Sequence, residues 1–164
     1  MTKVLILLGS QSDLPATEAG LDLLREMDIS FNLRIASAHR TPEHVDALIK
    51  GFEEQGGSII ICLAGMSAHL AGVAASLTTL PVLAVPIPGS TTAGFDALLS
   101  MVNMPAGIPV ATMGMGKSGF TNACLFSAQS LGLGDKNTAT LVAQDRARRT
   151  AKVLEADAEY QIMS

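Results

Sequence analysis

Residues 37–41 (SAHRT) place a histidine, His39, directly beside a permanently charged arginine, Arg40. Thr41 is a favourable N-cap and Pro42 suits the first helical position, so the sequence predicts a helix that begins here. A helix N-terminus presents unpaired N–H groups and a partial positive charge, which favour anions. A neutral imidazole next to a fixed cation is suited to proton transfer on an anionic ligand. Ordinary loop residues would also fit this segment alone, so the hypothesis depends on the other loops.

A second polar segment, residues 9–13 (GSQSD), follows an apolar run and precedes a predicted helix. The hydroxyls of Ser10 and Ser12, with nearby backbone N–H groups, could cradle a phosphate or a sugar. Asp13 would repel a phosphate, so we expect it to hold ribose hydroxyls. The alternative is that these residues only turn and cap the chain, with Asp13 as the N-cap of a helix predicted from residue 14. Arg40 could bind a phosphate through two parallel hydrogen bonds, which lysine does less well.

The other two histidines and a loop lysine are less specific signals. His69 lies just before a predicted helix, where it could be a hydrogen-bonded structural group or a catalytic one. His44 falls inside a predicted helix and is expected on its surface. Lys117 lies in the segment GMGKSG, which lacks the spacing of a Walker A loop, so no ATP site is expected.

Strands and helices are predicted to alternate along the chain. Apolar or alternating runs predict five strands, at residues 4–8, 31–35, 58–63, 82–85 and 110–113. Helical spacing and cap signals predict helices at residues 14–27, 42–55, 95–103, 121–131 and 137–158. A further helix is predicted after the third strand and its loop, ending at about residue 77. Because crossover connections are right-handed, this order predicts a five-stranded parallel sheet with helices on both faces. The predicted fold class is a three-layer α/β/α domain, flavodoxin-like or Rossmann-like, with an extra C-terminal helix.

In such sheets a ligand binds beyond the carboxyl ends of the strands. Five loops should meet there, at residues 9–13, 37–41, 64–72, 86–94 and 115–119. They contain two of the three histidines, together with Arg40 and Lys117. This clustering is the strongest argument for a functional site that the residues themselves provide.

Length and composition limit the possible classes of protein. The 164 residues contain no linker or repeat, so we expect a single domain with a core at residues 3–131 and a helix at about 137–158. A net charge of −4, from 11 basic and 15 acidic side chains, argues against a nucleic-acid partner. No apolar run is long enough to span a membrane and no signal-peptide pattern is present, which favours a cytoplasmic protein.

The cysteines and the apolar composition lead to two further expectations. Cys62 and Cys124 are far apart and lack neighbours at metal-ligand spacing, so we expect two buried hydrophobes rather than a disulfide or a metal site. The chain is 48% hydrophobic with only five Phe, one Tyr and no Trp, which suggests that other subunits cover some apolar surface. The last predicted helix is weakly amphipathic and is expected to pack against a neighbouring subunit. Its sparse apolar stripe consists of Leu141, Val142, Val153 and Leu154.

Four segments, GSQSD, SAHRTPE, AGMSAHLAG and DALLSMVNMPAGIPVAT, resemble successive signature blocks of the PurE family, the catalytic subunit of phosphoribosylaminoimidazole carboxylase. The resemblance covers roughly residues 3–131. It implies a 5-(carboxyamino)imidazole ribonucleotide mutase of purine biosynthesis, which moves a carboxylate from the exocyclic nitrogen to a ring carbon of its substrate. It also implies no metal, no ATP and no organic cofactor, and a homo-octamer with sites at subunit junctions.

The resemblance also assigns roles to individual residues. His39 matches the catalytic histidine of the family. The implied substrate-binding positions are Ser10, Ser12, Asp13, Ser37, Arg40, Gly65, His69 and Leu70. In the implied mechanism the substrate releases carbon dioxide inside a closed pocket, and the ring carbon then attacks the trapped molecule. His39 would serve first as the acid and then as the base.

A second branch of the resembled family carboxylates aminoimidazole ribonucleotide directly with carbon dioxide. That branch typically has lysine in place of Arg40 and lacks the histidine at the position of His69, so both residues favour the mutase. Met66, Ser67 and Ala71 depart from the mutase pattern, which keeps the direct carboxylase open as the alternative.

Other classes fit the sequence less well. A receiver domain would need an aspartate directly after the third strand, where this chain has Ala64 and Gly65. A flavin-binding electron carrier would need aromatic residues in loops that contain almost none. A non-catalytic, flavodoxin-like nucleotide-binding module remains open, although it would leave the pairing of His39 with Arg40 unexplained.

Overall fold

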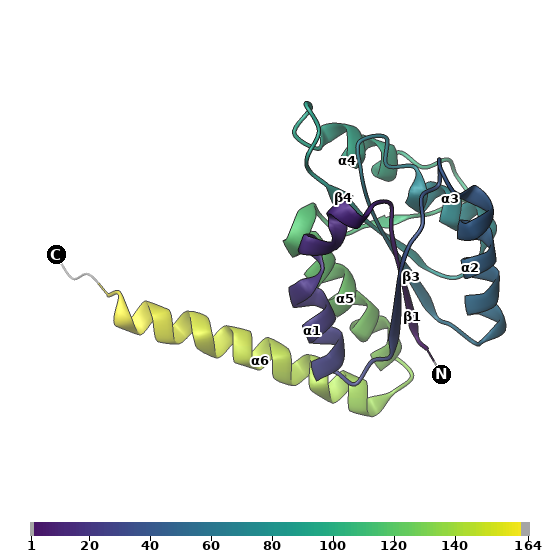
Figure 1. The fold of residues 1–164 in the computed structure, drawn as a ribbon. Coiled ribbons are helices and arrows are strands. Elements are labelled where there is room, and N and C mark those ends of the chain that lie inside the picture. The colour runs from purple at the N-terminus through teal and green to yellow at the C-terminus, as the bar shows by residue number, and fades with distance from the viewer. Residues whose placement is uncertain (1, 162–164) are drawn as a thin grey trace.

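A computed structural model describes residues 2–161 and contains one five-stranded sheet (Figure 1). The strands are β1 (Val4–Leu8), β2 (Phe31–Ile35), β3 (Ile59–Gly65), β4 (Val82–Ile87) and β5 (Ala111–Thr112). All neighbouring strands are parallel, in the order β2-β1-β3-β4-β5. The predicted parallel α/β architecture is therefore confirmed.

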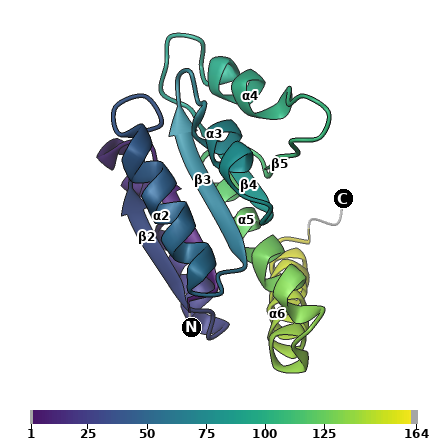
Figure 2. The same ribbon diagram turned by 90° about the vertical axis from the view of Figure 1, so that its right-hand side faces the viewer.

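Helices cover both faces of this sheet, as Figures 1 and 2 show. The helices are η1, a 3-10 helix (Gln11–Ala16), α1 (Glu18–Glu26), α2 (Pro42–Glu54), α3 (Leu70–Leu77), α4 (Phe95–Val102), α5 (Gly116–Gly132) and α6 (Lys136–Glu159). Helices α2, α3 and α4 pack on one face, and α1 and α5 on the other. Figure 2 shows α2 and α3 lying side by side in front of the sheet.

The central strands are apolar on both sides because both faces are covered. In β1, Leu5 and Leu7 join the core under α2 and α3, whereas Ile6 and Leu8 join the core under α1 and α5. Strand β2 lies at the edge of the sheet and is only partly buried, as its alternating sequence predicts. The two cysteines are free and buried, and burial raises the pKa of each thiol.

The start of the first helix differs from the prediction, which placed Asp13 as the cap of a helix from residue 14. Ser10 is the N-cap instead, and its side chain accepts a hydrogen bond from the Ser12 N–H. Asp13 is the third residue of η1 and accepts from the Ser10 N–H, which completes a capping box. The α-helix itself begins only at Glu18.

The predicted start of α5, at residue 121, is also too late, because the glycines before it favour a loop. The helix begins at Gly116, and the turn before it uses Gly114 with a φ of 90°. A Cβ on Gly119 would lie 2.1 Å from the carbonyl oxygen of Gly114, so glycine permits this close approach. The third and fourth strands each extend two residues beyond their predicted ends, and the fifth, predicted at residues 110–113, has only two residues.

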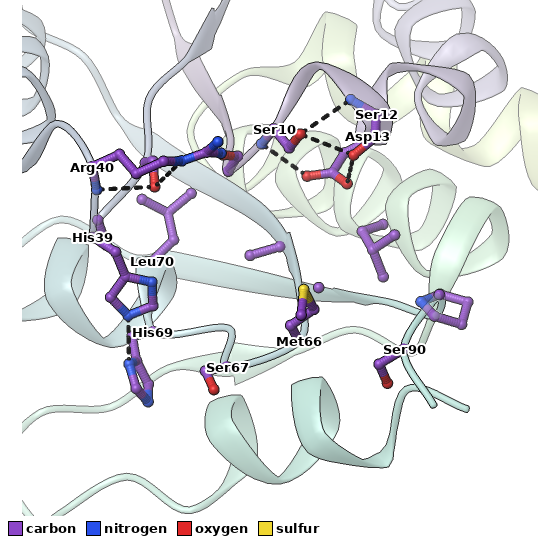
Figure 3. Close-up of a pocket in the computed structure, with 18 residues that line it drawn as sticks. Ser10, Ser12, Asp13, His39, Arg40, Met66, Ser67, His69, Leu70 and Ser90 are labelled. Carbon is purple, nitrogen blue, oxygen red and sulfur yellow. Dashed lines mark hydrogen bonds between the residues drawn. The ribbon is translucent and has the colours of Figure 1, made fainter. Parts of the chain in front are cut away.

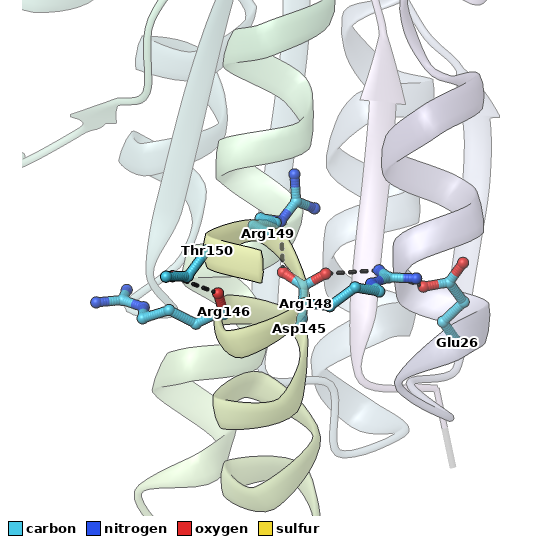
Figure 4. Close-up of polar contacts among 6 residues, drawn as sticks. All are labelled: Glu26, Asp145, Arg146, Arg148, Arg149 and Thr150. Atoms are coloured by element: carbon cyan, nitrogen blue, oxygen red, sulfur yellow. Dashed lines mark hydrogen bonds and ion pairs between the residues drawn. The ribbon is translucent and has the colours of Figure 1, made fainter. Parts of the chain in front are cut away.

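Helix α6 begins on the body of the molecule and then projects away from it (Figure 1). Its first half packs on α5, with Leu141 and Val142 against the core. Asp145 lies at the end of this packed half and accepts hydrogen bonds from Arg148 and Arg149, while Arg148 also pairs with Glu26 of α1 (Figure 4). Although burial opposes the shift, these two arginines lower the pKa of Asp145.

The outer half of α6 does not pack against the body of the molecule as the first half does. Every residue from 146 to 161 is exposed. Within residues 2–161, no helix combines the length and the apolar character needed to cross a membrane.

Candidate functional site

A cavity of about 940 Å³ lies at the carboxyl ends of β1, β3 and β4 and beside the loop after β2. Figure 3 shows the side chains that line it. Strand β1 has β2 on one side and β3 on the other, so the loops that follow these strands surround one point, as expected where strand order reverses. All nine predicted site residues line this cavity: Ser10, Ser12, Asp13, Ser37, His39, Arg40, Gly65, His69 and Leu70.

The loop after β1 presents a connected set of oxygen atoms. The Ser12 hydroxyl lies 2.9 Å from that of Ser10 and 3.3 Å from Asp13 Oδ1 (Figure 3). Asp13 is only 6% exposed. Burial raises the pKa of Asp13, while hydrogen bonds from the Ser10 N–H and the Ser12 hydroxyl oppose that shift. The result is a rigid, polar wall on one side of the cavity.

The loop after β2 is closed by bonds between its two ends. The Thr41 hydroxyl donates to the Ser37 carbonyl at 3.1 Å and accepts from the Ser37 N–H at 3.0 Å. Thr41 stands at the N-cap position of α2, but its side chain makes no capping hydrogen bond. The prediction of Thr41 as the N-cap residue is therefore confirmed, but its hydroxyl closes the loop that carries His39 and Arg40 instead of bonding to the helix.

Arg40 connects the first two loops. Its Nη2 donates to the Gly9 carbonyl at 3.1 Å, and its Nε donates to the Ser37 hydroxyl at 3.4 Å. These contacts hold the guanidinium beside the serines of the first loop, although the side chain stays exposed. Its other N–H groups can still engage a phosphate or carboxylate of a ligand.

His39 and His69 meet although they are thirty positions apart in the chain. His39 Nε2 lies 2.8 Å from His69 Nδ1, and the two rings cross at 81° with centroids 5.0 Å apart (Figure 3). His44, by contrast, is exposed on α2 as predicted. Across residues 2–161 no three potential ligands among His, Cys, Asp and Glu form a cluster suited to a metal ion.

The sequence predicted no site role for nine other lining residues. These are Gly9, Ala38, Ala64, Met66, Ser67, Ile87, Pro88, Gly89 and Ser90. Most lie in loops that were expected to reach the site, so position after a strand was the only available signal. Met66 adopts a positive φ of 56°, which is uncommon for a residue with a side chain.

One predicted loop does not reach the cavity. Residues 115–119 were expected at the site, but Lys117 lies in the first turn of α5, is exposed and does not line the cavity. The reason is that the chain enters the helix at Gly116, before the lysine.

A family model described as AIR carboxylase matches residues 3–152. The chain belongs to the AIR carboxylase family. Among similar members, a protein of Brucella melitensis named N5-carboxyaminoimidazole ribonucleotide mutase is 45% identical over 93% of this chain and 94% of its own. A Methanocaldococcus jannaschii protein of the same name is 42% identical over 98% of both chains.

Solved structures of proteins titled PurE are similar to this chain. The crystal structure of Treponema denticola PurE matches this fold with a TM-score of 0.88 and 31% identity, over 99% of this chain and 100% of that one. The described fold is therefore shared with a solved PurE protein over nearly the whole chain.

Proposed function

We propose that this AIR carboxylase family member is an N5-carboxyaminoimidazole ribonucleotide mutase of de novo purine biosynthesis. It converts 5-carboxyamino-1-(5-phospho-D-ribosyl)imidazole into 5-amino-1-(5-phospho-D-ribosyl)imidazole-4-carboxylate. The main support for this function is that His39, Arg40 and the Ser10 to Asp13 segment line one cavity, in a chain that is 45% identical to a protein of that name. The direct carboxylase alternative is not favoured, because the similar curated proteins are named mutases.

The charges around the cavity suit a phosphorylated sugar. Arg40 binds the substrate phosphate or carboxylate, helped by the hydroxyls of Ser10 and Ser12. Asp13 stands apart from the guanidinium contacts and accepts hydrogen bonds from ribose hydroxyls. Ser37, Gly65 and Leu70 complete the contact surface around the imidazole.

The reaction needs one proton donor that later acts as the acceptor. The carbamate carbon–nitrogen bond breaks, carbon dioxide is released, and His39 gives a proton to the exocyclic nitrogen. The ring carbon then attacks carbon dioxide with a ring electron pair, and His39 removes the proton from that carbon. Each proton and electron pair is accounted for, so the chemistry calls for no ATP, metal or organic cofactor. Enclosing carbon dioxide keeps its effective concentration high.

An ultraviolet assay of the purified protein tests this function. Carboxyaminoimidazole ribonucleotide should be converted without added bicarbonate, ATP or metal, because the transferred carboxylate comes from the substrate itself. Turnover of aminoimidazole ribonucleotide with carbon dioxide, and of no other substrate, would instead establish the carboxylase alternative. If the protein turns over neither compound but still binds the product, it is instead a non-catalytic binding module.

We further propose that the protein is a cytoplasmic homo-octamer whose sites lie at subunit junctions. The support is the unpacked outer half of α6, where Val153 is 68% and Leu154 64% exposed. A helix this long and weakly amphipathic is stabilised best by contact with another subunit.

Leu154→Asp should shift the protein toward smaller assemblies, because a carboxylate in a subunit contact loses its hydration without gaining a partner. Analytical ultracentrifugation measures the mass, and circular dichroism checks that the fold is retained. Gln55→Glu is the matched control, since it also adds one negative charge at an exposed position but lies at the end of α2. An unchanged mass for Leu154→Asp would show that this part of α6 lies outside the subunit contacts.

A further inference from the structure

We propose that His69 is a positioning residue that acts through His39: it accepts a hydrogen bond from His39 Nε2 and so leaves His39 Nδ1 as the nitrogen that exchanges a proton with the substrate. This inference rests on the proposed mutase function and deepens it. It differs from the expectation that His69 itself binds the substrate.

The geometry allows one proton between the two rings. At 2.8 Å, His39 Nε2 and His69 Nδ1 are at hydrogen-bond distance, so one nitrogen donates and the other accepts. Two N–H groups facing each other at this distance would repel, and two bare nitrogens would make no bond. The tautomers of the two rings are therefore linked.

The contact with His69 occupies His39 Nε2, so Nδ1 is the nitrogen of His39 that is left to act as the base. When both rings are neutral and His39 Nδ1 is bare, the shared proton lies on His39 Nε2 and His69 carries its own proton on Nε2. Uptake of a proton at His39 Nδ1 gives the acid form without moving any other atom. Figure 3 shows the His39 ring edge with this second nitrogen turned toward the other lining residues, while Nε2 points at His69.

The backbone around His69 is held in place by its neighbours. Ala68 and Leu70 are 1% and 2% exposed, so the peptide between them has little freedom although the imidazole itself is exposed. His69 stands at the N-cap position of α3, yet its side chain makes no capping hydrogen bond. The ring is directed to His39 instead.

A histidine suits this position better than the carboxylate that often orients a catalytic histidine. The substrate carries a phosphate and a carboxylate, and a second carboxylate beside His39 would repel them. The other ionisable groups that line the cavity, over residues 2–161, are Arg40 and Asp13. Arg40 attracts the substrate anions, and Asp13 belongs to the wall built by Ser10 and Ser12.

Two variants of His69 and one control test the inference by kinetics. His69→Phe keeps the ring contact but removes the acceptor, so kcat should fall about 10–100-fold while KM changes less than about threefold. His69→Asn restores an acceptor near the position of Nδ1 and should recover part of that loss. His44→Phe, on the exposed face of α2, should leave both constants unchanged. An unchanged kcat in His69→Phe, or a rise in KM alone, would overturn the positioning role.

Nitrogen-15 spectra of labelled histidines provide a readout that does not depend on activity. At roughly pH 8.5, where an ordinary histidine is neutral, His39 should show a proton on Nε2 and a bare Nδ1. The His69→Phe protein should show a mixture of both tautomers. A wild-type His39 protonated on Nδ1 would contradict the inference even if the mutase assay succeeds. Correct spectra in a protein without turnover would instead contradict the proposed function.

Discussion

Replacing His39 with asparagine should lower kcat by about 10²–10⁴-fold, because the proposed mechanism assigns both the donation and the removal of the proton to His39. The loop should keep its shape, because the hydrogen bonds between Thr41 and Ser37 and from Arg40 to Gly9 remain. Affinity for the product, 5-amino-1-(5-phospho-D-ribosyl)imidazole-4-carboxylate, should stay within a few fold, since Arg40 and the serines remain. Steady-state ultraviolet kinetics and titration calorimetry measure the two quantities.

His44→Asn provides the matched control for the loss of a histidine, because His44 is exposed on α2 and does not line the cavity. Its kcat should equal that of the unchanged protein. Substantial turnover in His39→Asn would remove His39 from the acid–base role. Loss of product binding in the same variant would show that His39 is chiefly a binding residue.

Gly119→Ala should destabilise the protein by about 3 kcal/mol, at the upper end of the cost of overpacking. Its Cβ would lie 2.1 Å from the Gly114 carbonyl oxygen and 3.3 Å from a methyl group of Val85. The first of these neighbours is backbone and cannot rotate away, so the start of α5 must move relative to β4. Urea denaturation at equal protein concentrations measures the change in the free energy of unfolding.

Gly51→Ala is the opposite case and serves as the control. Gly51 lies within α2 with no other atom within 4 Å of the added Cβ, so alanine should stabilise the protein by about 0.5–1 kcal/mol through helix propensity. Equal stabilities for the two variants would show that Gly119 does not approach Gly114 closely in solution.

Local patterns predicted the elements well where one physical signal dominated. The apolar run of β1 and the alternating pattern of β2 gave the observed bounds, because burial on two faces or one face sets those periods. Polar residues with several possible partners were predicted less well. Asp13 was predicted as an N-cap but is the third residue of η1, whereas Thr41 is the N-cap of α2 but its hydroxyl bonds within its own loop.

The sequence by itself determined that the chain forms a parallel α/β sheet and that His39, Arg40 and Asp13 follow its strands. These facts depend on periodicity and chain order, which are local. The tertiary structure decided that His69 contacts His39, that Arg40 reaches Gly9, and that the loop of Lys117 stays outside the cavity. Such contacts join loops that follow different strands, so they depend on strand order, register and the exact start of each helix, none of which a local pattern specifies.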